Sequence, residues 1–228
     1  MSGFYRTAVG KKWVMAITGL VLMGFVFAHM VGNLKMYLGP THYDEYAEWL
    51  RTGLLVPILP DGVALWGMRV VLIVAVGYHI HAAYSLTMLN RRARPQRYAS
   101  PRDYIAASWA ARTMRWSGVI VALFIVFHLA DLTTGWANPD FHAGDVYANV
   151  VASFQRWPVA LFYVLANLAL GVHLYHGVWS LFQTMGSMSP HFNPRHNPLR
   201  RAAAAGFTIL VVGPNISFPI AVLTGVVG

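Results

Sequence analysis

The chain has 228 residues, of which 57% are hydrophobic and only 11% are charged. Soluble domains carry about 25% charged residues, so the composition excludes an ordinary soluble domain and predicts that lipid surrounds most of the chain. The net charge of +9 is concentrated in loops, which favours the positive-inside rule over nucleic-acid binding. Because the chain contains no cysteine, a redox centre that it holds alone needs histidine ligands.

Five segments are long and apolar enough to cross a bilayer core of about 30 Å as helices. They are residues 13–37, 63–89, 116–136, 157–185 and 202–227. The first is too long for a signal peptide and has no clear cleavage site, so we expect it to be retained. No internal repeat is apparent. We therefore predict one all-α membrane domain over residues 1–228, an antiparallel bundle of five transmembrane helices.

The Lys and Arg residues predict the orientation of this bundle. Most of the 17 fall in the N-terminal segment, the second loop and the fourth loop, whereas most acidic residues fall in the other loops. The positive-inside rule then puts the N-terminus in the cytoplasm and the C-terminus outside. After Thr41, a candidate N-cap followed by Asp44, apolar residues at helical spacing predict a short amphipathic helix on the outer surface.

Six of the ten histidines lie inside the expected spans: His29, His79, His81, His128, His173 and His176. Ionisable groups at membrane depth are usually functional, although a single one is more often a neutral, packed histidine. At a helix rise of about 1.5 Å per residue, His29 and His128 lie roughly 22–24 Å from the cytoplasmic ends of their helices, and His79 and His173 roughly 16–18 Å. A six-coordinate haem iron takes one imidazole from each side, so two such layers predict two bis-histidine haems.

His81 and His176 form a third level, nearer the cytoplasm. His79 and His81 are two positions apart and cannot face the same haem on a helix. Three roles stay open for His81 and His176: a contact to a haem ligand or propionate, a hydrogen bond to quinone, or ligation of another metal centre that a partner subunit completes.

Quinone sites need a polar group at the edge of an apolar slot. On the outer side the candidates are Tyr46 and Glu48 of the predicted surface helix. On the cytoplasmic side they are Arg6, Lys12, His81, Trp179 and Ser180. The sequence does not choose between the two sides.

Asp131 is the only acidic residue within the expected spans, and it follows His128 by three positions on the same helix face. Two roles follow from this position: Asp131 orients the imidazole or takes up a proton. The alternative is a carboxylate that extends to the nearby outer surface.

Four blocks of sequence, in this order, are similar to a known family. They are GKKWVMAITGL at 10–20 with His29-Met30 and Asn33-Leu34, His79 with LNRRAR at 89–94, His128-Leu129, and HLYHGVWS at 173–180 with QTMG at 183–186. Together they resemble the cytochrome b subunit of succinate dehydrogenases that have a single five-helix anchor. The blocks cover nearly the whole chain and are specific only in combination.

The resemblance implies a function as well as a fold. It implies two b haems, with His29 and His128 as ligands of the one farther from the cytoplasm and His79 and His173 as ligands of the nearer one. It also implies that flavoprotein and iron–sulfur subunits dock on the cytoplasmic face of the inner membrane. In this respiratory complex II, electrons pass from succinate, a tricarboxylic acid cycle intermediate, to menaquinone or ubiquinone, or in reverse for fumarate reduction.

The catalytic step at succinate is expected in the partner subunits, because the chain has no candidate nucleophile or paired carboxylates in its spans. The basic stretch from Arg91 to Arg102 suits docking of the iron–sulfur subunit, with anionic lipid head groups as the alternative. The number of complexes in an assembly, including a higher oligomer, stays open.

Three alternatives to this function stay open. The first is the cytochrome b anchor of another quinone-linked dehydrogenase, such as a formate dehydrogenase or hydrogenase. The second is a haem-free anchor whose histidines pack or bind quinone. The third, ranked lowest, is a transporter that uses the histidines as a proton relay.

Overall fold

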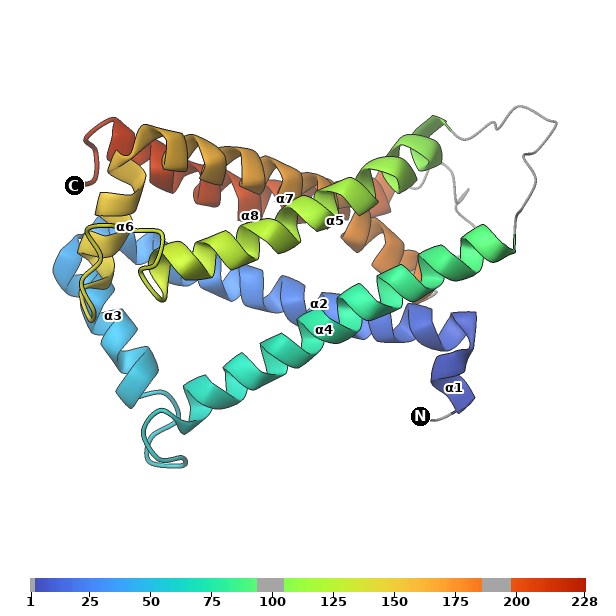
Figure 1. Ribbon diagram of the computed structural model, residues 1–228, viewed down its shortest axis with the longest axis horizontal. Helices are drawn as coiled ribbons and strands as arrows, with labels where there is room; N and C mark the ends of the chain where they lie inside the picture. The colour runs from blue at the N-terminus through green and yellow to red at the C-terminus, as the bar shows by residue number, and fades with distance from the viewer. Residues whose placement is uncertain (1–2, 94–104, 186–197) are drawn as a thin grey trace.

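The computed structural model describes residues 3–93, 105–185 and 198–228, with the side chains of 105–112 left out (Figure 1). All regular secondary structure in these ranges is helical. The helices are α1 (Gly3–Arg6), α2 (Ala8–Asn33), η1 (Leu34–Leu38), α3 (Pro40–Thr52), α4 (Val63–Arg92), α5 (Ile105–Leu132), α6 (Val146–Gln155), α7 (Trp157–Thr184) and α8 (Pro198–Leu223).

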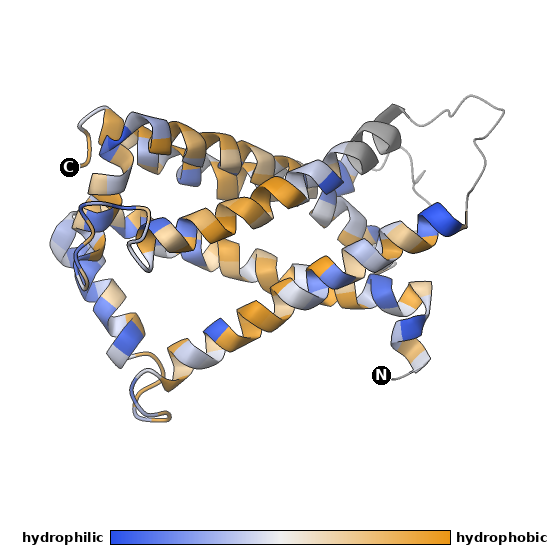
Figure 2. Ribbon diagram, in the orientation of Figure 1, coloured by the Kyte–Doolittle hydropathy of each residue, from blue (hydrophilic) through white to orange (hydrophobic). Residues whose placement is uncertain are grey.

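Within the described ranges, five helical segments are long and apolar enough to cross a membrane, which confirms the predicted class and number of spans. They are Ala8–Leu38, Val63–Arg92, Thr113–Leu132, Trp157–Thr184 and Pro198–Leu223. Figure 2 shows apolar residues along all five. The orientation of the bundle across the membrane stays a prediction.

The third span ends earlier than predicted, at Leu132 instead of 136. The backbone N–H groups of Thr133 and Thr134 both bind the carbonyl of Leu129, at 3.0 and 2.9 Å. Gly135 then has a φ of +75°, which turns the chain away and leaves Trp136 87% exposed. The predicted span was too long because Trp136 and Ala137 are apolar and so keep the hydropathy high. The left-handed backbone of Gly135 ends the helix before them.

The predicted amphipathic helix exists as α3, but its expected cap is wrong. The helix begins at Pro40, and Gly39, with a φ of +93°, occupies the cap position without a side-chain hydrogen bond. Thr41 therefore lies inside the first turn. Asp44 accepts a hydrogen bond from the backbone N–H of Tyr147 at 2.9 Å, which ties α3 to the start of α6. The location of α3 at a membrane surface stays a prediction.

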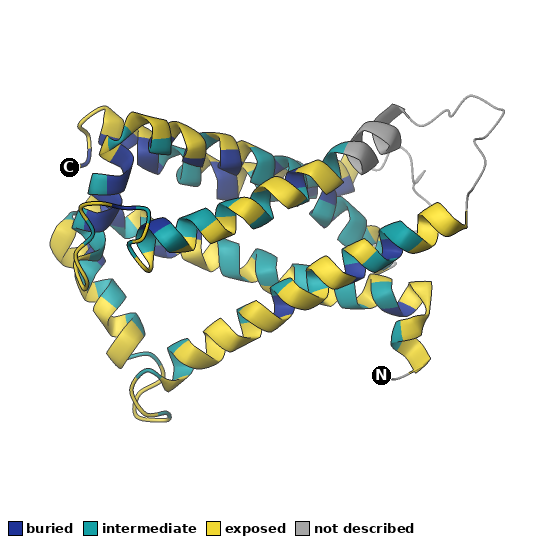
Figure 3. Cartoon of the chain, viewed as in Figure 1, coloured by how far each residue is buried: buried dark blue, intermediate teal, exposed yellow. Residues whose placement is uncertain are grey.

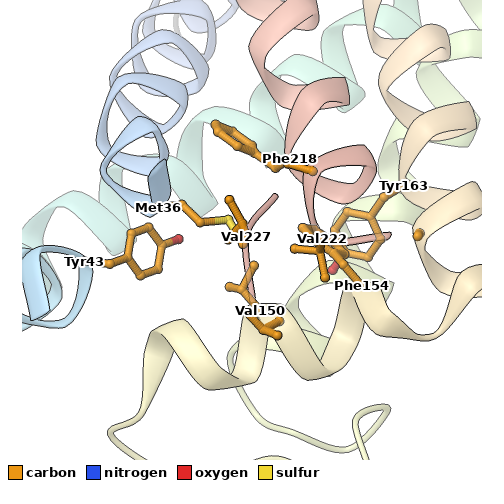
Figure 4. Packing of buried hydrophobic residues seen from close by; sticks show 11 residues of the cluster. Met36, Tyr43, Val150, Phe154, Tyr163, Phe218, Val222 and Val227 are labelled. Atoms are coloured by element: carbon orange, nitrogen blue, oxygen red, sulfur yellow. The ribbon is translucent and has the colours of Figure 1, made fainter. Parts of the chain in front are cut away.

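Among the described residues, the larger of the two clusters of buried apolar residues lies at one end of the bundle, where α3, α6 and the C-terminal residues meet α7 and α8 (Figures 3 and 4). Met36, Phe154 and Phe218 belong to this cluster. Gly225, with a φ of +72°, turns the chain so that Val227 also joins it. A packed core here fixes the ends of α5 and α7 relative to each other.

The long helices pair in a way that positions the site. α2 packs along α4, and α5 packs along α7, while α8 covers α7 from the other side. Much of α4 and α5 stays exposed in the isolated chain (Figure 3), as expected for helices that face lipid or partner subunits.

Gly135→Ala is expected to lower the thermal stability of the purified protein more than Gly144→Ala. Both glycines have positive φ, and an alanine costs about 1–2 kcal/mol at either position for that reason. A Cβ at Gly135 would also collide with the ring of Phe141, whereas a Cβ at Gly144 meets open space. Thermal unfolding followed by circular dichroism in detergent measures the difference, and equal losses would show that the Phe141 contact is unimportant.

Candidate functional site

Four of the six predicted histidines face each other in two pairs. The ring centroids of His29 on α2 and His128 on α5 are 5.9 Å apart, and those of His79 on α4 and His173 on α7 are 6.2 Å apart. Each pair joins a helix of the α2–α4 unit to a helix of the α5–α7 unit. The bundle thus brings together the same partners that the depth along each helix predicted.

The spacing of each pair suits a metal held between two imidazoles. A metal–imidazole bond is about 2 Å, so two rings on opposite sides of one metal have centroids about 6 Å apart. The observed separations of 5.9 and 6.2 Å agree with this value. Among the described residues, no group of three histidine, cysteine or acidic side chains gathers. Each pair offers two imidazoles, which is the donor set of a bis-histidine haem.

None of these four histidines is fully buried by the chain's own side chains. His79, His128 and His173 are partly exposed and His29 is exposed. An iron held by an imidazole binds the nitrogen lone pair in the plane of the ring, so a haem needs space at the nitrogen edge of each ring.

Two glycines let helix backbones lie against the rings of one pair. A Cβ at Gly19 of α2 would stand 3.4 Å from Cε1 of His79, and a Cβ at Gly118 of α5 would stand 3.3 Å from Cε1 of His173. Larger side chains at these positions would push on the rings, so the glycines help to set where the two imidazoles sit.

An internal repeat that the sequence analysis missed relates α2 to α5. In both helices a methionine is followed three positions later by a hydroxyl residue, then directly by glycine, and ten positions after that by a ligand-candidate histidine. The residues are Met15, Thr18, Gly19 and His29 in α2, and Met114, Ser117, Gly118 and His128 in α5. The repeat is visible in the amino-acid sequence, but it is short, and Thr in one copy is Ser in the other.

Hydroxyl groups define which ring nitrogen carries the proton. Thr18 Oγ1 lies 3.2 Å from Nδ1 of His79 and donates its own proton to the carbonyl of Val14 at 2.7 Å. Tyr163 Oη lies 3.3 Å from Nδ1 of His128 and donates its proton to Asp131 at 2.9 Å. Since each hydroxyl has one proton, it accepts from Nδ1–H, and Nε2 of both histidines keeps the lone pair that a metal needs.

His29 differs, because its Nε2 lone pair accepts a hydrogen bond that a metal at this nitrogen would replace. The amide nitrogen of Asn33, which only donates, lies 3.4 Å from its Nε2. Tyr43 donates to the other side of that amide at 3.0 Å. Burial, with help from Asp44 and Tyr46, raises the pKa of Tyr43 to about 12, so the phenol stays a donor at neutral pH.

Asp131 does not extend to the outer surface, so that alternative is wrong. Its side chain is 0% exposed and pairs with Arg156 at 2.6 Å. Ser153 and Tyr163 also donate to it. Asp131 is therefore connected to His128 by hydrogen bonds through Tyr163, a residue that the sequence analysis did not single out.

The two remaining histidines lie apart from the pairs. His81 points toward α1, where Nδ1 lies 2.5 Å from the hydroxyl of Tyr5 and the two rings stack at 5.7 Å. His176 is buried, with Nε2 3.5 Å from Thr113 Oγ1. The described contacts thus separate these two residues, which the sequence had placed at one level.

The quinone candidates stay divided between the two ends. Tyr46 stacks on Trp49 at 5.9 Å and lies against Gly32, one turn from His29. Glu48 is exposed and pairs with Arg51 at 3.4 Å. At the other end, Arg6 and Lys12 are exposed and Trp179 and Ser180 are partly buried. Among these candidates, Tyr46 contacts Gly32, in the helix turn that follows His29.

Comparison with known proteins gives one match. Residues 88–213 match the family model described as succinate dehydrogenase/fumarate reductase transmembrane subunit. Searches of curated proteins and of solved structures give no significant match. The matched segment includes His128 and His173 and covers more than half of the chain. The chain therefore belongs to the family of transmembrane subunits of succinate dehydrogenase and fumarate reductase.

Proposed function

We propose that the chain is the cytochrome b anchor of a succinate:quinone oxidoreductase and holds two b haems, one between His29 and His128 and one between His79 and His173. The observation that carries the proposal is the pair of ring separations, 5.9 and 6.2 Å, across the bundle. Bound haems supply one-electron transfer, which links an iron–sulfur subunit to quinone in the membrane.

The residues of the chain fit this cofactor in three further respects. Hydroxyl contacts leave the lone pair of His79 and His128 on Nε2, the nitrogen that points away from the supporting helix. None of the four histidines is fully buried within the chain. Gly19 and Gly118 admit close approach to His79 and His173. The chain's contribution is to hold and orient four neutral imidazoles in a medium of low dielectric constant.

The partners follow from the family and from charge. We propose that flavoprotein and iron–sulfur subunits dock at the end of the bundle that carries α1, on the cytoplasmic side of the inner membrane. Exposed Arg91 and Arg92 end α4 there. Residues 94–102 of the predicted docking stretch lie outside the described residues. The family match gives no support to the anchor of a formate dehydrogenase or hydrogenase.

A tagged copy of the chain is expected to co-purify with a flavoprotein and an iron–sulfur subunit. The purified complex should reduce a quinone analogue with electrons from succinate, while the chain alone should not oxidise succinate. Mass spectrometry of the eluate and a quinone-reduction assay measure both points. Co-purification of a different dehydrogenase would reject the assignment.

His29→Ala and His79→Ala are each expected to remove about half of the haem, because each breaks one bis-histidine site. The reduced-minus-oxidised spectrum of the complex and its haem-to-protein ratio measure this loss. His42→Ala, an exposed histidine of α3 outside both pairs, is the matched control and should leave haem content unchanged. Full haem content in both site variants would reject the ligand assignment, and an unaltered complex without haem would favour the haem-free anchor.

Gly118→Val is expected to lower occupancy of the His79–His173 site selectively. Its Cβ would already stand 3.3 Å from the His173 ring, and a branched side chain would displace that ring. Gly213→Val on α8, where a Cβ meets open space, is the control. Redox titration of the two haem components distinguishes the sites, and equal retention in both variants would contradict the role given to Gly118.

A further inference from the structure

We propose that Tyr163 and Asp131 are positioning residues for His128, and that this link ties the electron donation of one haem ligand to a buried ion pair. The inference rests on the proposed function, since it assumes that His128 binds haem. The sequence had offered Asp131 as a group that orients His128; the structure adds Tyr163 as the residue between them and Arg156 as the charge partner of Asp131.

The donor and acceptor of each hydrogen bond in this network are fixed, because Tyr163 has a single hydroxyl proton. Tyr163 donates its only hydroxyl proton to Asp131 at 2.9 Å, so toward His128, at 3.3 Å, it acts as acceptor. His128 must then carry its proton on Nδ1 and keep the lone pair on Nε2. The tautomer of His128 is thus set from the far side of the ring by a phenol and a carboxylate.

The carboxylate at the end of this chain is held by three elements. Asp131 belongs to α5, Ser153 donates to it from α6, and Arg156, at the junction of α6 and α7, binds it at 2.6 Å. A second bond from Arg156 to the carbonyl of Ala137, at 2.8 Å, fixes the guanidinium. A buried carboxylate that accepts hydrogen bonds from Ser153, Arg156 and Tyr163 stays in place, so it is a firm support for the Tyr163 hydroxyl.

An ionised acceptor behind a hydroxyl makes the hydroxyl oxygen a stronger acceptor. The bond from His128 Nδ1–H is strengthened, and Nε2 becomes a better electron donor to a ferric centre. His79 has no such support: its hydroxyl partner, Thr18, donates to the neutral carbonyls of Val14 and Met15. Loss of the network is therefore expected to affect one haem and spare the other.

Tyr163→Phe in the intact complex tests the link, because it removes the hydroxyl and keeps the ring that packs on Phe124 and Phe154. The midpoint potential of the His29–His128 component should rise, and its electron paramagnetic resonance g-values should shift, while the His79–His173 component stays unchanged. Tyr175→Phe, on the same helix about 18 Å away, is the control and should move neither component.

A double-variant cycle tests whether Asp131 acts through Tyr163. Asp131→Asn should raise the same midpoint potential in the unaltered chain and have little further effect in a Tyr163→Phe background. Two haems present with both components unmoved by Tyr163→Phe would overturn the inference and leave the proposed function intact. Independent, additive shifts would overturn the ordered link, and a complex without haem would instead overturn the proposed function.

Discussion

The structure depends on one constraint: each imidazole inside a lipid-embedded bundle needs a partner for its N–H group and for its lone pair. His29 and His79 both show how the chain supplies such partners. Each faces a second imidazole across the bundle and has its protonation defined by a hydroxyl or amide on a neighbouring group or on its own helix. Close helix packing alone would have buried these histidines, and none of the four is fully buried within the chain.

The repeat between α2 and α5 involves all four of the paired histidines. In each copy the glycine touches the histidine of a neighbouring helix, while the histidine ten positions later faces its counterpart in the other copy. Each helix therefore supports one pair and contributes a ligand to the other. Ten positions correspond to about 15 Å of helix, so the repeat also fixes the two levels along the bundle.

Much of the fold and of the pairing could be predicted because hydropathy and helix rise are local properties. The span over α4 and the depths of His79 and His173 needed only residue counting. The helix end before Gly135 could not be read this way, because a left-handed backbone angle overrides hydropathy. The partners of Asp131 were also beyond reach, since Arg156 is 25 positions away and meets it only after α6 folds back. The sequence had left three roles open for Asp131: orienting His128, taking up a proton, or extending to the outer surface.

The same folding-back gives the packed end of the bundle a second role. Phe154 of α6 contacts the ring of Tyr163, with centroids 4.8 Å apart, while Ser153, the preceding residue, donates to Asp131. The apolar and polar faces of one short helix thus act on the same phenol, the first by packing its ring and the second by holding its acceptor. Under the proposed link, a loop helix outside the five spans takes part in orienting His128, and the packing of that end affects the electronic state of the proposed haem site.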